Sequence, residues 1–254
     1  MTAAGGAGPG TFAPGAMGHV AAQRAPGQAV AELLALPGVE ERVVLSGRVG
    51  FLAFHGGLEG GTEIIASAAA AASGASYYAI VQPPSVRWHL PSHVVGAGAS
   101  PALTAFLAHV DLAVAVHGYG RLDRPRDLLL GGRSRALASH LGDSLRRRLP
   151  DCVVVDALER IPAEMRGLHP QNPVNRCRVG GVQLELPSAV RGASGRWADD
   201  NSSCVPDQRL IEALVDLASD PSLASVFGPL PCHAPVDGPV DHHPPAPGRL
   251  TADG

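Results

Sequence analysis

Two uninterrupted apolar segments in this chain each end in a His-Gly pair. The first reads Phe51-Leu-Ala-Phe-His55-Gly, and the second reads Leu112-Ala-Val-Ala-Val-His117-Gly. A segment that is apolar at every position suits a strand covered on both faces, which is typical of α/β sheets. Open α/β sheets bind their ligands at the carboxyl ends of the strands. We therefore expect an α/β protein that presents His55 and His117 at one edge of its sheet.

The rest of the chain alternates between strand and helix patterns. The Ala-rich segment 62–73 predicts a helix with Thr62 as its N-cap and Gly74 after its last residue. Further helices are expected over residues 28–36, 101–109, 133–149, 161–166 and 206–218, and strands over 42–45, 48–54, 76–81, 111–117, 152–156 and 180–187. This alternation predicts a single α/β domain with a mixed, mostly parallel sheet.

The two ends of the chain lack this alternation. Residues 1–27 are rich in Gly, Ala and Pro, and residues 228–254 are rich in Pro and Gly. Both segments are expected to be disordered, because neither has the apolar pattern that would pack against a core. The α/β domain is accordingly expected to span residues 28–227.

Charge and composition exclude several classes of protein. The formal net charge is −3 and no basic block occurs, so nucleic acid is not an expected partner. No segment approaches the roughly 20 apolar residues of a membrane span, and no signal peptide is recognisable, so a cytoplasmic protein without a membrane partner is expected. The four cysteines have no C-x-x-C spacing, which argues against a zinc finger. Cys177 and Cys204 are either free thiols or a disulfide.

The first His-Gly pair is followed by a carboxylate, in His55-Gly-Gly-Leu-Glu59. If the two apolar strands are neighbours, His55, Glu59 and His117 meet at one point. Two histidines and one glutamate form a zinc-binding set that leaves a coordination position open for water. The alternative is that both histidines bond to backbone carbonyls at the strand ends.

An acidic residue also interrupts the apolar segment Gly181-Val-Gln-Leu-Glu185-Leu. Glu185 points to the opposite face from Leu184 and Leu186, because side chains alternate along a strand. Burial would raise the pKa of Glu185 toward neutrality and make it a suitable general base for hydrolysis of an amide. The alternative is an exposed carboxylate on an edge strand.

Candidate substrate-binding residues lie in the loops. The guanidinium of Arg176, in Asn172-Pro-Val-Asn175-Arg176, is suited to bidentate binding of a carboxylate, and Arg191 is a weaker candidate. One of His89 and His93 is expected to line the site, and we assign His93 to it. Each of these residues has the alternative of a solvated surface position.

A serine esterase is the competing enzyme class. Gly142-Asp-Ser144-Leu matches a short esterase motif, and His55-Gly-Gly matches the oxyanion motif of lipases. Ser144 falls inside an expected helix, however, and the chain has no nucleophile elbow.

Taken in order, four of these motifs resemble the poly-γ-glutamate hydrolase family, known from phage enzymes that cut the poly-γ-glutamate capsule. The motifs are His55-Gly-Gly-Leu-Glu59-Gly-Gly-Thr-Glu63, His117-Gly118, Asn172-Pro-Val-Asn175-Arg176 and Gly181-Val-Gln-Leu-Glu185-Leu, and the similarity extends from about residue 43 to 191. It implies a fold similar to zinc carboxypeptidases, with helices on both faces of a mixed sheet.

The same resemblance implies a zinc ion held by His55, Glu59 and His117. It implies that Glu185 acts as the base that activates water and then protonates the leaving amine, and that Asn175 and Arg176 hold a substrate carboxylate. The expected reaction is hydrolysis of an amide next to a carboxylate, in a small peptide or a γ-glutamyl polymer.

The spacing within the first motif differs from the family pattern. The family places the carboxylate five residues after the histidine, whereas Glu59 follows His55 by four. Glu63 is therefore an alternative ligand, although a capping role at the helix start suits it better. A metal-binding member of the fold without turnover is the alternative function.

Overall fold

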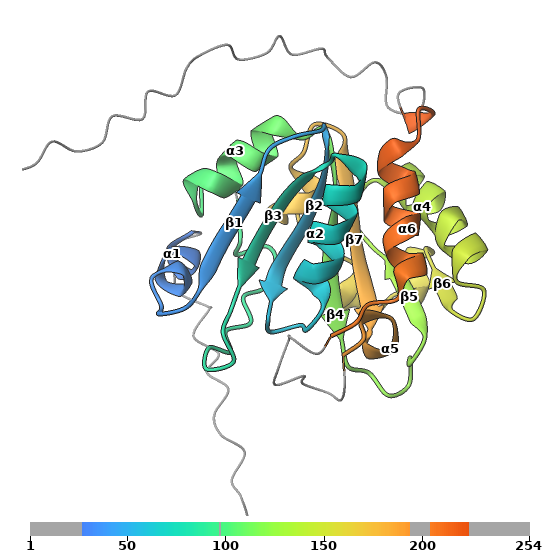
Figure 1. The fold of residues 1–254 in the computed structure, drawn as a ribbon, viewed down its shortest axis with the longest axis horizontal. Helices are drawn as coiled ribbons and strands as arrows, with labels where there is room; N and C mark the ends of the chain where they lie inside the picture. The colour runs from blue at the N-terminus through green and yellow to red at the C-terminus, as the bar shows by residue number, and fades with distance from the viewer. Residues whose placement is uncertain (1–26, 97, 194–203, 224–254) are drawn as a thin grey trace, which may run out of the picture.

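The computed structural model describes residues 27–96, 98–193 and 204–223, which form a seven-stranded sheet with helices on both faces (Figure 1). The strand order is β1-β3-β2-β4-β7-β5-β6. The strands are β1 (Glu40–Val44), β2 (Val49–Gly56), β3 (Ser76–Val81), β4 (Leu112–Tyr119), β5 (Asp127–Leu130), β6 (Val153–Val155) and β7 (Gly180–Pro187). The α-helices are α1 (Gln28–Leu34), α2 (Thr62–Ser73), α3 (Pro101–His109), α4 (Arg135–Arg148), α5 (Ser188–Arg191) and α6 (Gln208–Ser219). Short 3₁₀ helices are η2 (Leu158–Arg160), η3 (Ala163–Met165) and η4 (Pro173–Asn175).

The sheet is mixed and mostly parallel, as expected from the sequence. Strands β3, β2, β4 and β7 run parallel to one another, and so do β5 and β6. Strand β1 is antiparallel to β3, and β5 is antiparallel to β7. The carboxyl ends of β2, β4 and β7 therefore meet at one edge, and β7 lies inside the sheet.

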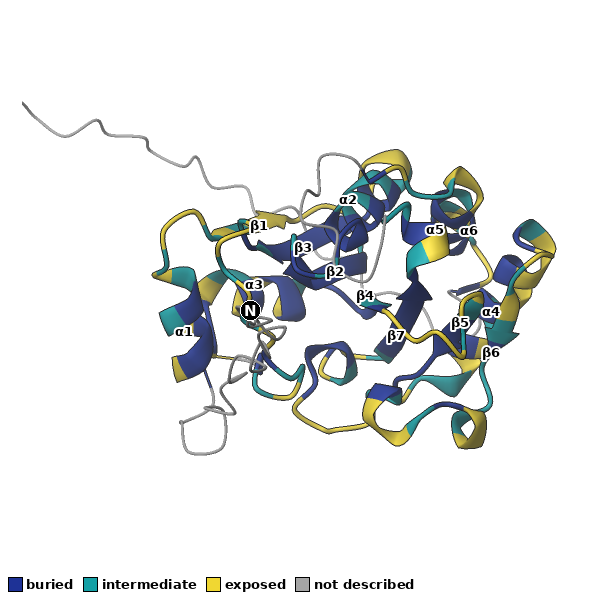
Figure 2. Ribbon diagram, turned by 90° about the horizontal axis from the view of Figure 1, so that it is seen from below, coloured by how far each residue is buried: buried dark blue, intermediate teal, exposed yellow. Residues whose placement is uncertain are grey.

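Helices cover both faces of the sheet, which explains why β2 and β4 have no polar side chain before the histidine near their carboxyl ends. On one face, α2, α4 and α6 pack over Val114 of β4 and Leu184 of β7. On the other face, α1 and α3 pack over Leu52 of β2 and Ala115 of β4. Figure 2 shows these central strands buried, with exposed residues concentrated in the connecting loops and on outer helix surfaces. The expected arrangement of helices on both faces is confirmed.

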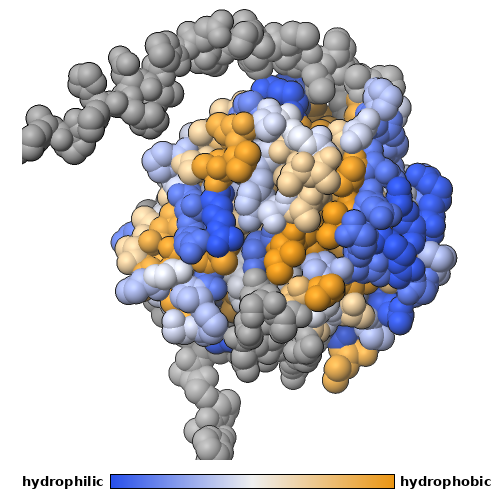
Figure 3. All heavy atoms as spheres, in the orientation of Figure 1, coloured by the Kyte–Doolittle hydropathy of each residue, from blue (hydrophilic) through white to orange (hydrophobic). Residues whose placement is uncertain are grey.

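The outer surface of α4 is hydrophilic, in contrast to its buried face. A leucine recurs every four residues on its buried face, at Leu137, Leu141 and Leu145. Burial of each side chain contributes about 1.5–3 kcal/mol to the free energy of unfolding. On the exposed side, Arg148 bridges to α6 through Glu212 and Asp216 at 2.6 and 2.7 Å. Figure 3 shows hydrophilic residues gathered on this side of the molecule.

Two local expectations need correction. Gly61, with φ of 89°, is the N-cap of α2, and Thr62 is the first helical residue. Among the described residues the buried Thr62 hydroxyl has no hydrogen-bond partner. The helix expected over residues 161–166 is also shorter than expected, and residues Ala163–Met165 form the 3₁₀ helix η3.

Cys177 is buried and carries a free thiol, so a disulfide between Cys177 and Cys204 is not formed. None of the described helices is both long and apolar enough to cross a membrane. The segments expected to be disordered, 1–27 and 228–254, lie almost entirely outside the described residues.

Candidate active site

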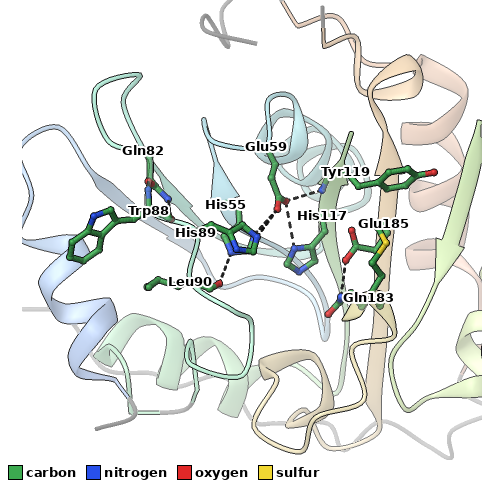
Figure 4. A network of polar contacts seen from close by, with 12 residues as sticks. His55, Glu59, Gln82, Trp88, His89, Leu90, His117, Tyr119, Gln183 and Glu185 are labelled. Atoms are coloured by element: carbon green, nitrogen blue, oxygen red, sulfur yellow. Dashed lines mark hydrogen bonds and ion pairs between the residues drawn. The ribbon is translucent and has the colours of Figure 1, made fainter. Parts of the chain in front are cut away.

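Three adjacent strands end at the same edge of the sheet, and each supplies one polar side chain. These are His55 from β2, His117 from β4 and Glu185 from β7 (Figure 4). Strand β2 pairs with β4, as a shared site for the two histidines requires, and His117 lies directly opposite Glu185 in the β4–β7 register. All three side chains are at least nine-tenths buried.

The turn after β2 returns the chain so that Glu59 faces His55. The backbone N–H of Glu59 donates to the carbonyl of His55 at 2.8 Å, which closes one helix-like turn. Gly57 has φ of 72°, and a Cβ atom at this position would collide with the carbonyl oxygen of Gln82. The four-residue spacing is therefore sufficient to bring the Glu59 carboxylate to 2.9 Å from Nδ1 of His55.

His55, Glu59 and His117 each place one ligand atom within 4.8 Å of the other two. Nε2 of His55 lies 2.8 Å from the carbonyl oxygen of Leu90, so the ring proton belongs on Nε2. In the neutral ring Nδ1 then presents a lone pair to the Glu59 carboxylate, whereas in the protonated ring the Nδ1–H group faces this carboxylate. Two lone pairs at this distance repel unless a proton or a cation lies between them. Two imidazoles and a carboxylate form a donor set that suits a metal ion such as zinc.

The electrostatics of the cluster favour an ionised Glu59. Burial alone would raise the pKa of Glu59, but the charge of His55 and hydrogen bonds from His117 and His55 hold this pKa well below its ordinary value. Burial alone would lower the pKa of His55, but Glu59 outweighs burial and the net shift is upward. The backbone N–H of Gly118 also donates to Oε2 of Glu59 at 2.8 Å. Glu59 is thus an anion over the neutral range, as a metal ligand must be.

Glu185 is in a different environment, although it is adjacent to the cluster. Burial raises the pKa of Glu185, and the charges of His117 and His55 only partly oppose the shift. The side-chain amide of Gln183 donates to Oε1 of Glu185 at 2.8 Å, and its own oxygen accepts from Asn172 Nδ2 at 2.7 Å. The Asn172 contact fixes the orientation of the Gln183 amide. Glu59 and Glu185 therefore have pKa values shifted in opposite directions, a pattern common among catalytic acid–base groups.

The loop residues expected to bind substrate make their contacts within the loops. Asn175 donates to the carbonyls of Gly167 and His169 and accepts from the backbone N–H of Arg133. Nη1 of Arg176 donates to Oε1 of Gln171 at 2.6 Å. The ring of His93 lies 4.7 Å from the ring of His169. The structure thus places Asn175 in a scaffolding position, whereas Arg176 and His93 are exposed.

The histidine that reaches the cluster is His89. Its ring centroid lies 4.4 Å from that of His55, and its Nε2 lies 3.5 Å from Oε1 of Glu59. His93 is the histidine expected here from the sequence, but two exposed loop histidines four residues apart are distinguished only by the path of the loop.

Arg191 is not a free carboxylate-binding group. Its side chain is buried, and its guanidinium donates to the backbone carbonyls of Gly60, Tyr119 and Leu186. Each carbonyl belongs to a segment that carries one of the site carboxylates or histidines. No pattern in the sequence indicates this role, because Gly60 and Tyr119 are 131 and 72 residues away from Arg191 along the chain and meet it only in the fold.

The alternatives for two other residues can now be compared. Glu63 lies in the first turn of α2 and accepts from the backbone N–H of Gly57 at 3.3 Å, outside the three-residue cluster. Ser144 lies on α4, and among the described residues its buried hydroxyl has no hydrogen-bond partner. A buried serine without an adjacent base gives no support to the serine esterase.

Comparisons with known proteins match the chain to one family model and to solved structures of similar fold. The model of the poly-gamma-glutamate hydrolase family matches residues 34–197. The solved structure of a bacteriophage poly-gamma-glutamate hydrolase matches with a TM-score of 0.62 and 26% identity, over 78% of this chain and 95% of that one. A structure described as zinc-free apo YNDL matches with a TM-score of 0.56 and 19% identity, over 70% of this chain and 86% of that one. No curated protein matches the chain in sequence.

Proposed function

Because this chain belongs to the poly-γ-glutamate hydrolase family, we propose that it hydrolyses γ-glutamyl amide bonds with a zinc ion held by His55, Glu59 and His117. The observation that carries the proposal is the convergence of these three ligand atoms beside Glu185, on strands that the family match includes. The substrate assignment rests on the family and on the bacteriophage enzyme of similar fold.

The residues have separate roles in this proposal. A zinc ion at the three-residue cluster would polarise the scissile carbonyl and lower the pKa of water. Glu185 accepts a proton from the attacking water and delivers it to the leaving amine. A buried carboxylate with a raised pKa suits both steps, because it binds a proton more readily than an ordinary carboxylate does. Gln183 holds the acceptor oxygen of Glu185 in place through its amide.

A γ-glutamyl substrate carries a carboxylate beside each scissile bond, and this group needs a cationic partner. Arg176 remains the proposed partner, because its guanidinium is exposed and its hydrogen bond to Gln171 uses only Nη1. Asn175 contributes by holding the Gly167 and His169 carbonyls of the same loop. His93, exposed on the facing loop, is proposed to line the approach to the site.

The test compares two buried glutamates, Glu185 and Glu63. Glu185→Gln removes the proposed base, and Glu63→Gln is the matched control because Glu63 is equally buried and also has a raised pKa. After loading with zinc, both variants and the wild type are expected to hold about one zinc per chain by mass spectrometry. Release of new amines from poly-γ-glutamate should be lost only in Glu185→Gln.

Variants of the ligands complete the experiment. His55→Ala and His117→Ala are expected to lose zinc. Loss of zinc in Glu63→Gln would identify Glu63 as the ligand instead of Glu59. A wild-type protein that holds zinc but releases no amines would be a metal-binding member of the fold without turnover, and the proposed reaction would be wrong.

A further inference from the structure

The loop 82–90 contacts two of the proposed metal ligands, and no role has yet been assigned to it. It follows β3 and contains no helix or strand. Two of its residues nevertheless reach the cluster: the carbonyl of Leu90 contacts His55, and the imidazole of His89 lies against both His55 and Glu59. A loop without its own backbone ladder holds such positions only if something else anchors it.

The anchor is the side chain of Gln82, which is buried although glutamine is usually exposed. Its Nε2 donates to the carbonyl oxygen of Trp88 at 2.8 Å, and its Oε1 accepts from the backbone N–H of Trp88 at 2.9 Å (Figure 4). The side-chain amide thereby pairs with one residue of the loop as a neighbouring strand would. The backbone N–H of Gln82 donates to the carbonyl of Gly56, the residue after His55. Gln82 therefore links the loop to the strand that carries the first ligand.

The other end of this connection determines which nitrogen of His55 faces the site. Leu90 follows Trp88 by two residues, and its carbonyl accepts a hydrogen bond at 2.8 Å from Nε2 of His55. A carbonyl accepts and never donates, so this contact keeps the proton on Nε2 and leaves the lone pair on Nδ1. Nδ1 is the atom that lies 2.9 Å from Glu59. Removal of a group that orients a ligating histidine through its second nitrogen commonly lowers metal affinity.

We propose that Gln82 is a positioning residue for the metal site, acting through Trp88 and the Leu90 carbonyl to keep Nδ1 of His55 available as a ligand. This inference rests on the proposed metal site. It adds to that site a residue that touches neither the metal nor the substrate. The His89 ring, stacked on His55 from the same loop, is held by the same anchor.

A purely structural role is the competing explanation, since removal of any buried double hydrogen bond destabilises a protein. The same strand provides a matched control at its opposite end. Ser76 is also fully buried, and its hydroxyl accepts from the N–H of Ser46 at 2.9 Å and donates to the carbonyl of Gly47 at 2.7 Å. Ser76 thus joins β3 to a loop backbone by two hydrogen bonds, as Gln82 does, but away from the ligands.

The experiment measures zinc affinity by competition with a chromophoric chelator, together with the melting temperature of the metal-free protein. Gln82→Met keeps the length of the side chain and removes both hydrogen bonds. It is expected to weaken zinc binding by about 10- to 100-fold. Ser76→Ala is expected to lower the melting temperature while zinc affinity stays within about twofold of wild type. Gln82→Glu keeps the acceptor for the Trp88 N–H, so it should bind zinc with intermediate affinity. This variant replaces Gln82→Met in the comparison if the methionine variant does not fold.

A second readout needs no metal. Long-range ¹H–¹⁵N spectra of metal-free protein report which ring nitrogens of His55 carry a proton. We expect a proton fixed on Nε2 in wild type and Ser76→Ala, because Nε2 faces the Leu90 carbonyl, and loss of this fixed proton in Gln82→Met. Zinc affinity in Gln82→Met equal to that of wild type, or a wild-type Nε2 without a proton, would overturn the proposal. Neither measurement uses substrate, so the result stands or fails independently of whether the protein hydrolyses γ-glutamyl bonds.

Discussion

Arg191 is the buried cation on which the geometry of the site depends most directly. Its guanidinium donates to the carbonyl of Gly60, next to Glu59, and to the carbonyl of Leu186, next to Glu185. It also donates to the carbonyl of Tyr119, two residues after His117. One side chain therefore joins the ends of all three strands that form the site.

The cost of removing this side chain follows from those contacts. Arg191→Met preserves much of the apolar stem and leaves three carbonyls without their donor. A buried acceptor that loses its donor costs about 1–3 kcal/mol. The contacts to Leu186 and Tyr119 are long, at 3.2 and 3.3 Å, so we take the lower value for each carbonyl and expect a loss of about 3 kcal/mol. Part of this loss is offset, because the variant no longer has a charged guanidinium to bury. A net loss of about 2 kcal/mol corresponds to a melting temperature about 4–8 °C lower in a domain of this size.

Arg135 provides the control, because it has the same chemistry away from the ligands. Its guanidinium donates to the carbonyls of Leu130 and Gly132, both at 3.0 Å, and to the carbonyl of Asp156. Thermal unfolding of the metal-free proteins should show both Arg191→Met and Arg135→Met destabilised. Zinc affinity should fall only in Arg191→Met. Equal zinc affinities in the two variants, or melting of Arg191→Met within about 1 °C of wild type, would refute this reasoning.

Two further predictions concern the same edge of the sheet. The pKa of Glu185 is raised in the fold, so its neutral form stabilises metal-free protein fully below the ordinary carboxyl pKa, and this contribution is lost as pH rises through the folded value. Glutamine stays neutral, so the melting temperature of Glu185→Gln relative to wild type should increase between pH 4 and pH 8; a difference independent of pH would contradict the assignment. A Cβ at Gly118 would lie 2.5 Å from Cζ of Arg191, so Gly118→Ala should cost about 1–3 kcal/mol in urea unfolding. Gly96→Ala, where the nearest atom is 3.7 Å away, should be nearly neutral, and equal losses in the two variants would show that the guanidinium is not confined over Gly118.

The parts of the fold predicted correctly are those that local sequence determines. Helix α2 and strand β3 have the expected bounds, because an alanine-rich segment and a short apolar segment are each ended by glycine or proline. The convergence of His55 and His117 was expected from two apolar strands that end in the same motif. The N-cap of α2 was wrong, because Gly61 adopts a positive φ that turns the chain before Thr62.

The features that sequence left open depend on strand order and on the path of loops. Whether Glu185 was an exposed edge residue or a buried base depended on the position of β7, which lies between β4 and β5. His89 rather than His93 reaches Glu59, because Gln82 fixes the loop at Trp88. An alternating or apolar pattern indicates which face of the sheet a residue occupies, but it does not indicate which strand or loop lies next to that residue.

The two His-Gly motifs show why the same local pattern has different physical causes. After His55, the positive φ of Gly57 and the closeness of the Gln82 carbonyl both exclude a side chain, and the resulting turn returns Glu59 to the histidine. After His117, the backbone of Gly118 continues the strand, and the position is restricted instead by the guanidinium of Arg191. The N–H of Gly118 donates to Glu59, so a substitution that moves Arg191 or Gly118 also moves a proposed ligand. Gly57, two residues after the first histidine, forms the turn, whereas Gly118, directly after the second, leaves room for the cation that joins the three strand ends.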